Sequence, residues 1–266
     1  MRRTLPLVAA LVALALTACG SSSGATTTSG SPASSSSRSS SAATGAITVF
    51  AASSLKESFS AIGAAFEAAN PGTKVTFNFG ASSTLATQIT QKAPADVFAS
   101  ASQKTMDTVT SAGAATGDTV FAVNTMEIAT PATPTVPVTS LADLAKPGVK
   151  VVICQKDVPC GAAAQKLFTQ NNLTVTPVSQ EVDVKAVLSK VVLGEADAGI
   201  VYVTDVKAAG AKVAGVVIPK DQNVTTTYPI APIASSTDAA TAKAFVDFVL
   251  SPAGQTVLAA AGFTSP

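Results

Sequence analysis

The sequence predicts an α/β fold built on mainly parallel sheets. From residue 47 onward, short apolar runs alternate with segments whose apolar residues recur at helical spacing, which is typical of such folds. The proline-rich stretch at residues 130–138 interrupts this alternation once. The roughly 220 residues that follow position 46 are enough for two lobes with cores of their own. We therefore interpret the interruption as a boundary loop on the second of two α/β lobes, rather than part of one continuous sheet.

The apolar runs predict strands at residues 47–51, 74–79, 96–99, 149–153, 197–202 and 213–218. Helices are predicted to follow Ser54, Ser82, Gly161, Asp183, Thr204, Asp238 and Pro252. In the helix after Asp183, the apolar stripe consists of Val184, Val187, Leu188 and Val191. Gly194 fits the end of that helix.

The first 18 residues are predicted to be a signal peptide. They carry two arginines and an apolar run at residues 5–16, which is too short to span a bilayer as a permanent helix. Residues 16–19 (LTAC) resemble a bacterial lipobox, which implies that Cys19 is acylated. An ordinary secretory cleavage site is the alternative. Residues 19–46 are rich in Ser, Thr, Gly and Ala, and we predict that they form a disordered tether because they cannot bury enough apolar surface to fold.

The part of the chain after residue 46 is close to neutral and lacks two residue types. Arg2, Arg3 and Arg38 all precede it, so that 14 lysines face 16 acidic residues, and the whole chain has no histidine. This balance disfavours nucleic acid or an anionic membrane surface as a partner, because both need clustered basic residues. The composition also excludes histidine bases, histidine metal ligands and arginine phosphate clamps from the domain.

Two cysteines remain once Cys19 is assigned to the lipid. Cys154 and Cys160 lie six residues apart in ICQKDVPCG, and an exported protein favours a disulfide between them. The alternative is a two-thiolate metal site, which lacks any histidine or further cysteine to complete its coordination. No metal ligand and no cofactor are predicted.

Two segments deliver a pair of serines from a strand to the start of a helix: VFAASSLKESF at residues 49–59 and VTFNFGASSTL at residues 75–85. The structural interpretation is capping, because Ser54 and Glu57 have the spacing of a capping box. Open α/β sheets, however, bind ligands beyond the carboxyl ends of their strands, where helix N–H groups attract anions. A capping hydroxyl can still donate its proton to an oxyanion, so that the two roles are compatible.

An enzymatic interpretation comes from Ser53 and Lys56, which form the S-x-x-K motif of penicillin-recognising serine enzymes. That family also needs a K-T-G strand and an S-D-N or similar loop. The nearest string, KTM at residues 104–106, falls in a predicted helix. A serine acyl-enzyme is therefore the less favoured alternative, and we predict no enzymatic activity.

Five segments resemble the molybdate-binding proteins of ABC importers, in order and with similar spacing. They are ITVFAASSL, FGASSTLATQITQKAPADVFASASQKTMD, DVPCGAAAQKLF, VDVKAVLSKVVLGEADAGIVYVTD and SPAGQTVLAAAGF. The resemblance covers residues 47–263 and implies a two-lobed periplasmic-binding-protein fold with the ligand in the interlobe cleft. The implied first lobe comprises residues 47–122 and 230–266, and the second comprises residues 123–229.

The resemblance also implies which residues hold the ligand. Hydroxyl groups would come from Ser54 and Ser82, for which the neighbouring serines at positions 53 and 83 are the alternatives. Main-chain N–H groups would come from Cys160 and Val184, although a small residue is expected at position 160. Tyr202 matches the tyrosine of the G-I-V-Y segment in that family. Without the resemblance, a half-buried strand tyrosine with its hydroxyl at the surface is an equally good interpretation.

The implied function is that of a lipid-anchored receptor in the cell envelope, outside the cytoplasmic membrane. It would bind molybdate, and also tungstate, as a monomer and deliver the anion to an ABC permease. A site of hydroxyl and N–H donors suits a dianion, because charge-assisted hydrogen bonds are strong. Hydrogen phosphate would keep an unpaired proton there, at a cost of about 1–3 kcal/mol. Sulfate carries no proton and must be rejected by size, so a receptor for sulfate or another tetrahedral oxyanion is the alternative.

Overall fold

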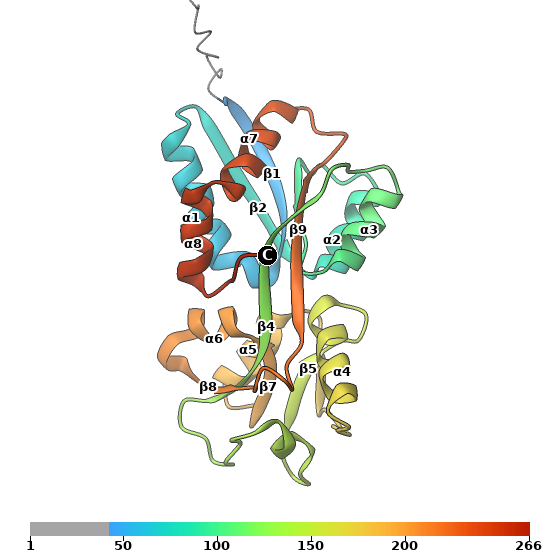
Figure 1. Ribbon diagram of the computed structural model, residues 1–266, viewed down its shortest axis with the longest axis vertical. Helices are drawn as coiled ribbons and strands as arrows, with labels where there is room; N and C mark the ends of the chain where they lie inside the picture. The colour runs from blue at the N-terminus through green and yellow to red at the C-terminus, as the bar shows by residue number, and fades with distance from the viewer. Residues whose placement is uncertain (1–42) are drawn as a thin grey trace, which may run out of the picture. The chain divides into compact units, whose positions relative to one another are not determined.

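Strands and helices alternate along residues 43–266, the part of the chain that the computed structural model describes (Figure 1). The predicted signal peptide, the lipidation site Cys19 and residues 19–42 of the predicted tether lie outside the described residues. Strand β1 (Gly45–Ala52) begins two residues before the predicted position 47.

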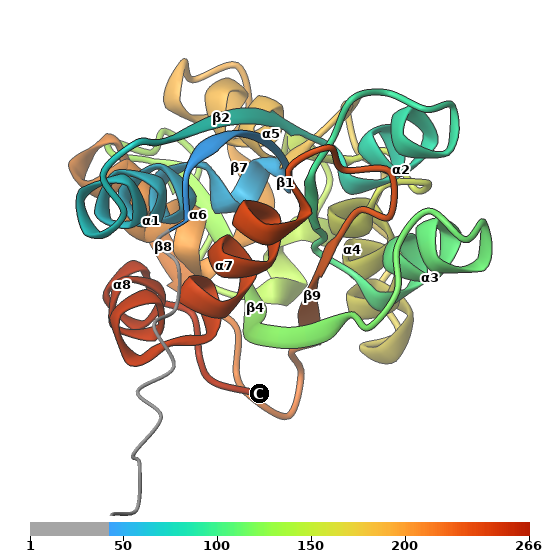
Figure 2. The ribbon, with the colours of Figure 1, turned by 90° about the horizontal axis from the view of Figure 1, so that it is seen from above.

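The first lobe is built around three parallel strands. Strand β1 lies between β2 (Thr73–Gly80) and β3 (Val97–Ala99) and runs parallel to both. Five helices belong to this lobe: α1 (Lys56–Ala69), α2 (Ser82–Thr90), α3 (Gln103–Ser111), α7 (Ala239–Leu250) and α8 (Pro252–Ala261). Seen from above, α1 and α8 lie on one side and α2 and α3 on the other (Figure 2). The helical spacing of apolar residues in α1 buries Phe59 and Phe66, which pack edge to face on Phe245 of α7.

The second lobe repeats this arrangement around β5 (Val151–Cys154). That strand is parallel to β6 (Ser179–Glu181) and β7 (Ala198–Tyr202), and helices α4 (Pro159–Gln170), α5 (Val184–Val192) and α6 (Val203–Ala209) follow the three strands. Strand β8 (Val213–Val217) and the short 3-10 helices η2 (Leu141–Ala145) and η3 (Gly210–Lys212) complete the lobe. Its apolar residues form a core cluster separate from those of the first lobe.

Two long strands run through both lobes (Figure 1). Strand β4 (Thr119–Pro131) pairs with β9 (Thr225–Pro232) in the first lobe and with β7 and β8 in the second. The hydrogen bonding is therefore continuous from β2 to β6, in the order β2-β1-β3-β9-β4-β7-β5-β6 with β8 on β4. The expectation that the lobes do not share a continuous sheet is wrong in this respect, because β4 is long enough to belong to both.

The local patterns predicted most elements within a few residues. Helix α4 begins at Pro159 rather than after Gly161. Strands β4, β6 and β9 were not predicted, and every antiparallel pairing involves β4 or β9. The proline-rich stretch at residues 130–138 follows the end of β4, where Val138 packs into the second-lobe core.

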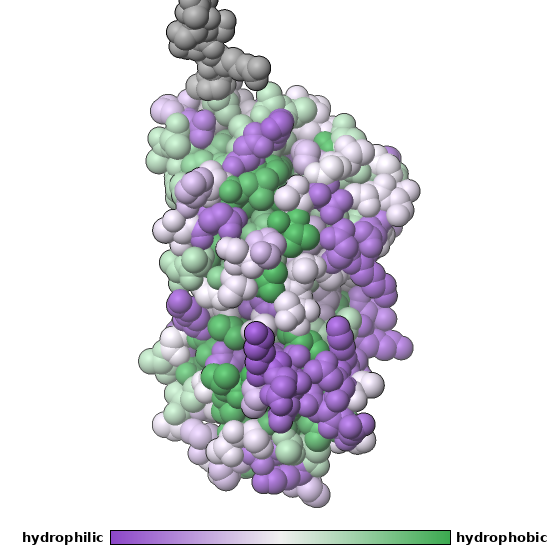
Figure 3. Space-filling view, in the orientation of Figure 1, coloured by the Kyte–Doolittle hydropathy of each residue, from purple (hydrophilic) through white to green (hydrophobic). Residues whose placement is uncertain are grey.

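The described helices are short. None of them is long and apolar enough by itself to cross a membrane, and α7 and α8 reach that length only as a pair bent by 59°. On the face shown in Figure 3, hydrophilic residues gather in the lower half, over the connection between β8 and β9, where Lys220, Asp221 and Gln222 are partly or fully exposed.

Candidate functional site

A cavity lies where the helix starts of the two lobes face each other. Its volume is small, about 10 Å³, far below the roughly 300–1,000 Å³ of pockets for organic ligands, and suits a ligand of few atoms. All five residues predicted to hold the anion line it, and each lies at or just beyond the carboxyl end of a strand. They are Ser54, Ser82, Cys160, Val184 and Tyr202. Ser53 also lines the cavity, whereas Ser83 is not among the lining residues.

Ser54 does not cap a helix. Residues Ser53–Leu55 form the 3-10 turn η1, and α1 begins only at Lys56, without a side-chain cap. The predicted capping box with Glu57 is therefore wrong, because the extra turn displaces the helix start. Ser54 is buried, and its Oγ lies 2.9 Å from the hydroxyl of Tyr228 on β9.

Ser82 also makes a tertiary contact instead of a cap. It is the first residue of α2, its side chain is buried, and the helix start has no side-chain cap. Its Oγ accepts a hydrogen bond of 3.0 Å from the main-chain N–H of Ala101. Because a main-chain N–H can only donate, the hydroxyl proton of Ser82 remains free for another acceptor.

The second lobe contributes the N-terminal ends of two helices. Cys160 is the second residue of α4, after Pro159, and Val184 is the first residue of α5. N–H groups in the first turn of a helix have no partner within the helix, and the helix dipole there favours an anion. Asp183 uses its carboxylate to accept from the N–H of Ala186, at 3.0 Å, and so caps α5.

The predicted disulfide is present and holds one of these helix starts. Cys154 at the end of β5 is bonded to Cys160 in α4, with 5.7 Å between their Cα atoms. Gly161 follows, and a Cβ atom at that position would lie 1.8 Å from the carbonyl oxygen of Gln155. The start of α4 thus lies directly against the end of β5, and only glycine permits this approach.

Tyr202 is completely enclosed at the end of β7. Its side chain is 1% exposed, so the alternative of a surface hydroxyl is wrong. Within the described residues the hydroxyl has no hydrogen-bond partner. Burial raises the pKa of Tyr202 well above its usual value, since the phenolate would be desolvated. Tyr202 therefore keeps its proton and is a hydrogen-bond donor without an acceptor.

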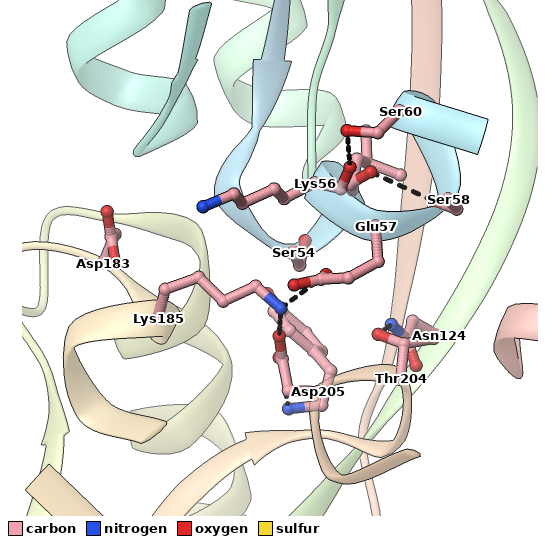
Figure 4. Close-up of polar contacts among 12 residues, drawn as sticks. Ser54, Lys56, Glu57, Ser58, Ser60, Asn124, Asp183, Lys185, Thr204 and Asp205 are labelled. Carbon is pink, nitrogen blue, oxygen red and sulfur yellow. Dashed lines mark hydrogen bonds and ion pairs between the residues drawn. The ribbon is translucent and has the colours of Figure 1, made fainter. Parts of the chain in front are cut away.

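An ion cluster connects the two lobes beside the cavity. Nζ of Lys185 on α5 lies 2.7 Å from Glu57 on α1 and 2.9 Å from the buried Asp205 on α6 (Figure 4). The second carboxylate oxygen of Asp205 accepts from the N–H of Tyr202 at 3.1 Å. Burial opposes the charge of Lys185, but the attraction of Asp205 and Glu57 outweighs it and leaves the pKa of Lys185 raised.

The residues around the cavity present donors, because the proton of Ser82, the proton of Tyr202 and two helix-start N–H groups have no acceptor of their own in the described part of the chain. No group of three or more Cys, Asp or Glu residues between positions 43 and 266 has the arrangement of a metal site. Such a set of neutral donors can hold a small, fully deprotonated anion through charge-assisted hydrogen bonds.

The sequence matches a known family. The sequence profile described as "Bacterial extracellular solute-binding protein" matches residues 47–264. The chain belongs to this family.

Individual relatives cover nearly the whole of this solute-binding protein. It is 43% identical to the "Molybdate-binding protein ModA" of Mycobacterium tuberculosis over 98% of this chain and 97% of the relative. The Escherichia coli protein of the same name is 35% identical over 83% and 89% of the two chains. Among solved structures, the periplasmic molybdate-binding protein of Azotobacter vinelandii superposes with a TM-score of 0.74 at 21% identity, over 83% of this chain and 99% of that one. That last match shows the likeness of the folds.

The S-x-x-K motif does not form a nucleophile and base pair in this solute-binding protein. Ser53 lines the cavity, but Lys56 is exposed on the first turn of α1. No hydrogen bond joins the two side chains in residues 43–266, the range that includes both. The relatives described above carry the name of a molybdate-binding protein.

Several residues in or around the site were not predicted to belong to it. Tyr228 lies in TTTYPIAP, a stretch without an anion-binding pattern, and Ala101 acts through its main chain alone. Lys185 stood next to the predicted Val184, but its two acidic partners lie far from it in the sequence. One signal was available: Tyr202 and Tyr228 are the chain's two tyrosines, and polar aromatic residues in apolar runs generally need a partner.

Proposed function

We propose that this solute-binding protein is the extracytoplasmic receptor for molybdate of an ABC importer. The observation that carries the proposal is the donor set of the cavity: two buried serine hydroxyls, one buried tyrosine hydroxyl and the N–H groups of two helix starts. A dianion satisfies all of them at once. The relatives named above, which are described as molybdate-binding, support the same ligand.

The roles of the individual residues are part of this proposal. Ser54 and Ser82 bind the anion from the first lobe, and Cys160, Val184 and Tyr202 bind it from the second. With donors on both sides, the anion holds the lobes together in a closed form. The ligand is cargo that is handed to the permease, and no cofactor takes part.

The lobe boundaries that we propose are residues 47–122 and 230–266 for the first lobe and residues 123–229 for the second. The core clusters support this division, because the second-lobe cluster runs from Met126 to Val224 and those of the first lobe draw on residues before 123 and after 227. Tyr228 is an exception, since it packs in a first-lobe cluster.

The finer points of the proposal concern the ligand range and the anchor. Tungstate has the same charge and tetrahedral shape as molybdate, and the donor set suits both. The LTAC segment supports attachment to the membrane through a lipid on Cys19, with residues 19–44 as a tether, because Gly45 and Ala46 belong to β1. We propose that the receptor acts as a monomer in the cell envelope.

A thermal-shift panel tests the ligand. Molybdate, tungstate, sulfate, phosphate and a β-lactam are added separately to the purified domain, residues 43–266. A ligand at a hundred times its dissociation constant stabilises the fold by about 2.7 kcal/mol, which is a clear rise in melting temperature. We expect molybdate and tungstate to give this rise, with sulfate and phosphate far behind.

Two outcomes would count against the proposal. A rise with sulfate and none with molybdate or tungstate would make the protein a sulfate receptor. Covalent modification by the β-lactam, seen as a mass increase, would favour the serine acyl-enzyme.

A further inference from the structure

Strand β4 changes partners at Met126, where it passes from one lobe to the other. In the second lobe β8 pairs with β4 up to Glu127, and in the first lobe β9 pairs with it from Thr125 onward. Met126 lies between these two pairings and belongs to neither, because residues 218–224 connect β8 to β9 at this level. Its side chain is 0% exposed, so its main-chain N–H and C=O groups need partners from elsewhere.

The side chain of Asn223 takes the place of the missing strand. Its Oδ1 accepts from the N–H of Met126 at 3.1 Å, and its Nδ2 donates to the carbonyl oxygen of Met126 at 2.8 Å. Oδ1 also accepts from the N–H of Val224 at 2.8 Å. The amide therefore has one orientation, since the reverse would set two N–H groups against its NH₂ group. In this orientation the side chain supplies the pair of bonds that a strand residue would give.

These bonds lie within the second lobe. Asn171 at the end of α4 donates to the carbonyl oxygen of Gln222 at 2.7 Å and so holds the connection that carries Asn223. Met126 and Val224 both belong to the second-lobe core cluster. The bonds between Asn223 and Met126 therefore do not have to break when the lobes separate.

The consequence is a narrow limit on where β4 can bend. The strand is held by β9 up to Thr125 and by Asn223 from Met126, which leaves the link between these two residues as the place of bending. A cavity of about 460 Å³ lies beside this point and is lined by both Met126 and Asn223. Without the amide, water in this cavity can take over the main-chain bonds. A main chain that is bonded to solvent opens more easily than one that is bonded to a fixed group.

The place of bending lies one strand away from the ligand cavity. On its other edge, Met126 pairs with Tyr202 at the end of β7. A less defined bend at Met126 lets Tyr202 take more positions relative to Ser54 and Ser82 of the first lobe. A ligand that needs donors from both lobes must then order more motion when it binds, and it binds more weakly.

We infer that Asn223 is a positioning residue, which takes the place of a strand at Met126, fixes where the lobes rotate and thereby strengthens ligand binding from outside the ligand cavity. Asn223 is not among the residues that line the ligand cavity. The inference rests on the proposed function, because it requires lobes that close on a ligand.

The test is Asn223→Ala in a purified domain with two nitroxide spin labels. Lys104→Cys on α3 and Leu193→Cys at the end of α5 place the labels on exposed positions of the two lobes. Pulsed electron paramagnetic resonance then gives the distribution of distances between the lobes. We expect a broader distribution in the ligand-free variant than in its labelled parent, and the same narrow distribution in both at saturating molybdate. Calorimetry without labels should show molybdate affinity reduced about 3- to 10-fold, as for added ordering on binding.

Asn171→Ala is the matched control. It removes a hydrogen bond to the same connection, at Gln222, and leaves the bonds between Asn223 and Met126 in place. We expect a lower melting temperature with the distance distribution and the affinity of the parent. An Asn223→Ala protein that behaves in this way too would overturn the inference and leave Asn223 a role in stability alone.

Failure of the inference and failure of the proposed function give different results. The ligand-free distance distribution needs no anion, so a broader distribution in Asn223→Ala supports the inference whichever oxyanion the protein binds. An unchanged distribution in a protein that binds molybdate tightly would refute the role of Asn223 and leave the proposed function intact.

If Asn223→Ala does not fold, hydrogen exchange at the N–H of Met126 in the wild-type domain replaces it. We expect this N–H to be protected to the same degree with and without molybdate, because its bond to Asn223 is present in both the open and the closed form. Exchange that is fast in the ligand-free protein and slows on addition of molybdate would contradict the inference.

Discussion

A hydroxyl group binds an oxyanion only when its proton is free, and in this site single contacts decide that freedom. The N–H of Ala101 occupies a lone pair of Ser82 and leaves its proton available. Tyr202 is buried with no partner for its hydroxyl in the described residues. Both side chains are buried and restricted by their packing, which lowers the ordering cost of binding.

Ser82→Ala tests this view of a single residue. We expect the molybdate affinity to fall about 10- to 100-fold, because a hydrogen bond to a charged group contributes about 1.5–3 kcal/mol. The free energy of unfolding also falls, since the N–H of Ala101 loses its acceptor. Calorimetric titration of the folded variant gives the affinity, and urea unfolding gives the stability.

Ser83→Ala is the control for that substitution, because Ser83 is the neighbouring serine of the same helix and does not line the cavity. Its affinity is expected to match that of the wild type. A Ser82→Ala protein that is less stable but binds molybdate as tightly as the wild type would reduce Ser82 to a structural residue.

At the scale of elements, the site is a set of helix starts that are held against strand ends. The turn η1 delays α1, so that Ser54 becomes part of a buried turn. The disulfide and the close approach at Gly161 fix the start of α4 against β5. A helix start that is fixed in this way presents its N–H groups in one orientation, as anion binding requires.

Removal of the disulfide tests whether this fixation matters for binding. In Cys154→Ser with Cys160→Ser, the free energy of unfolding is expected to fall by about 2–3 kcal/mol on the chain-entropy model. We also expect weaker molybdate binding, because the ordering of the turn must then accompany binding. Calorimetry compares the oxidised wild type with the double variant, and reduction of the wild type should reproduce the change. Equal affinities would limit the disulfide to a role in stability.

At the scale of the whole described domain, the two lobes are joined by shared strands and by one ion pair beside the cavity. Strands β4 and β9 connect the lobes on the main chain. Glu57 of the first lobe and Lys185 of the second form the ion pair, while Asp205 holds Lys185 from within the second lobe. If the lobes separate, the contact with Glu57 is lost and that with Asp205 remains.

Glu57→Gln is therefore expected to favour the open form. We predict that the dissociation rate constant of molybdate rises about two- to fivefold. This factor corresponds to a contribution of up to about 1 kcal/mol from a partly exposed ion pair to the stability of the closed form. The increase should shrink at high salt because the pair is partly exposed. Stopped-flow kinetics separates this effect from the association rate, which rises when a negative charge near an anion site is removed.

Asp247→Asn is the matched control, because it removes the same charge from an ion pair with Lys243 that lies within α7 of the first lobe. Its dissociation rate should equal that of the wild type. If Glu57→Gln lowers the melting temperature of the ligand-free protein and leaves the dissociation rate unchanged, the pair does not act on lobe closure.

The sequence by itself determined the α/β alternation, most of the elements and the disulfide, and it pointed to five residues that are all among those lining the cavity. These are local features: apolar spacing, a strand that leads into a helix start, and ordered segments that resemble a family. Tertiary structure alone decided how the hydroxyl groups are oriented and how the lobes are joined. Ser54 meets Tyr228 across 174 positions, and Lys185 meets Glu57 across 128. The capping box was mistaken for the same reason: a local pattern describes what a side chain can do, while burial against distant strands decides which of its possible partners it has.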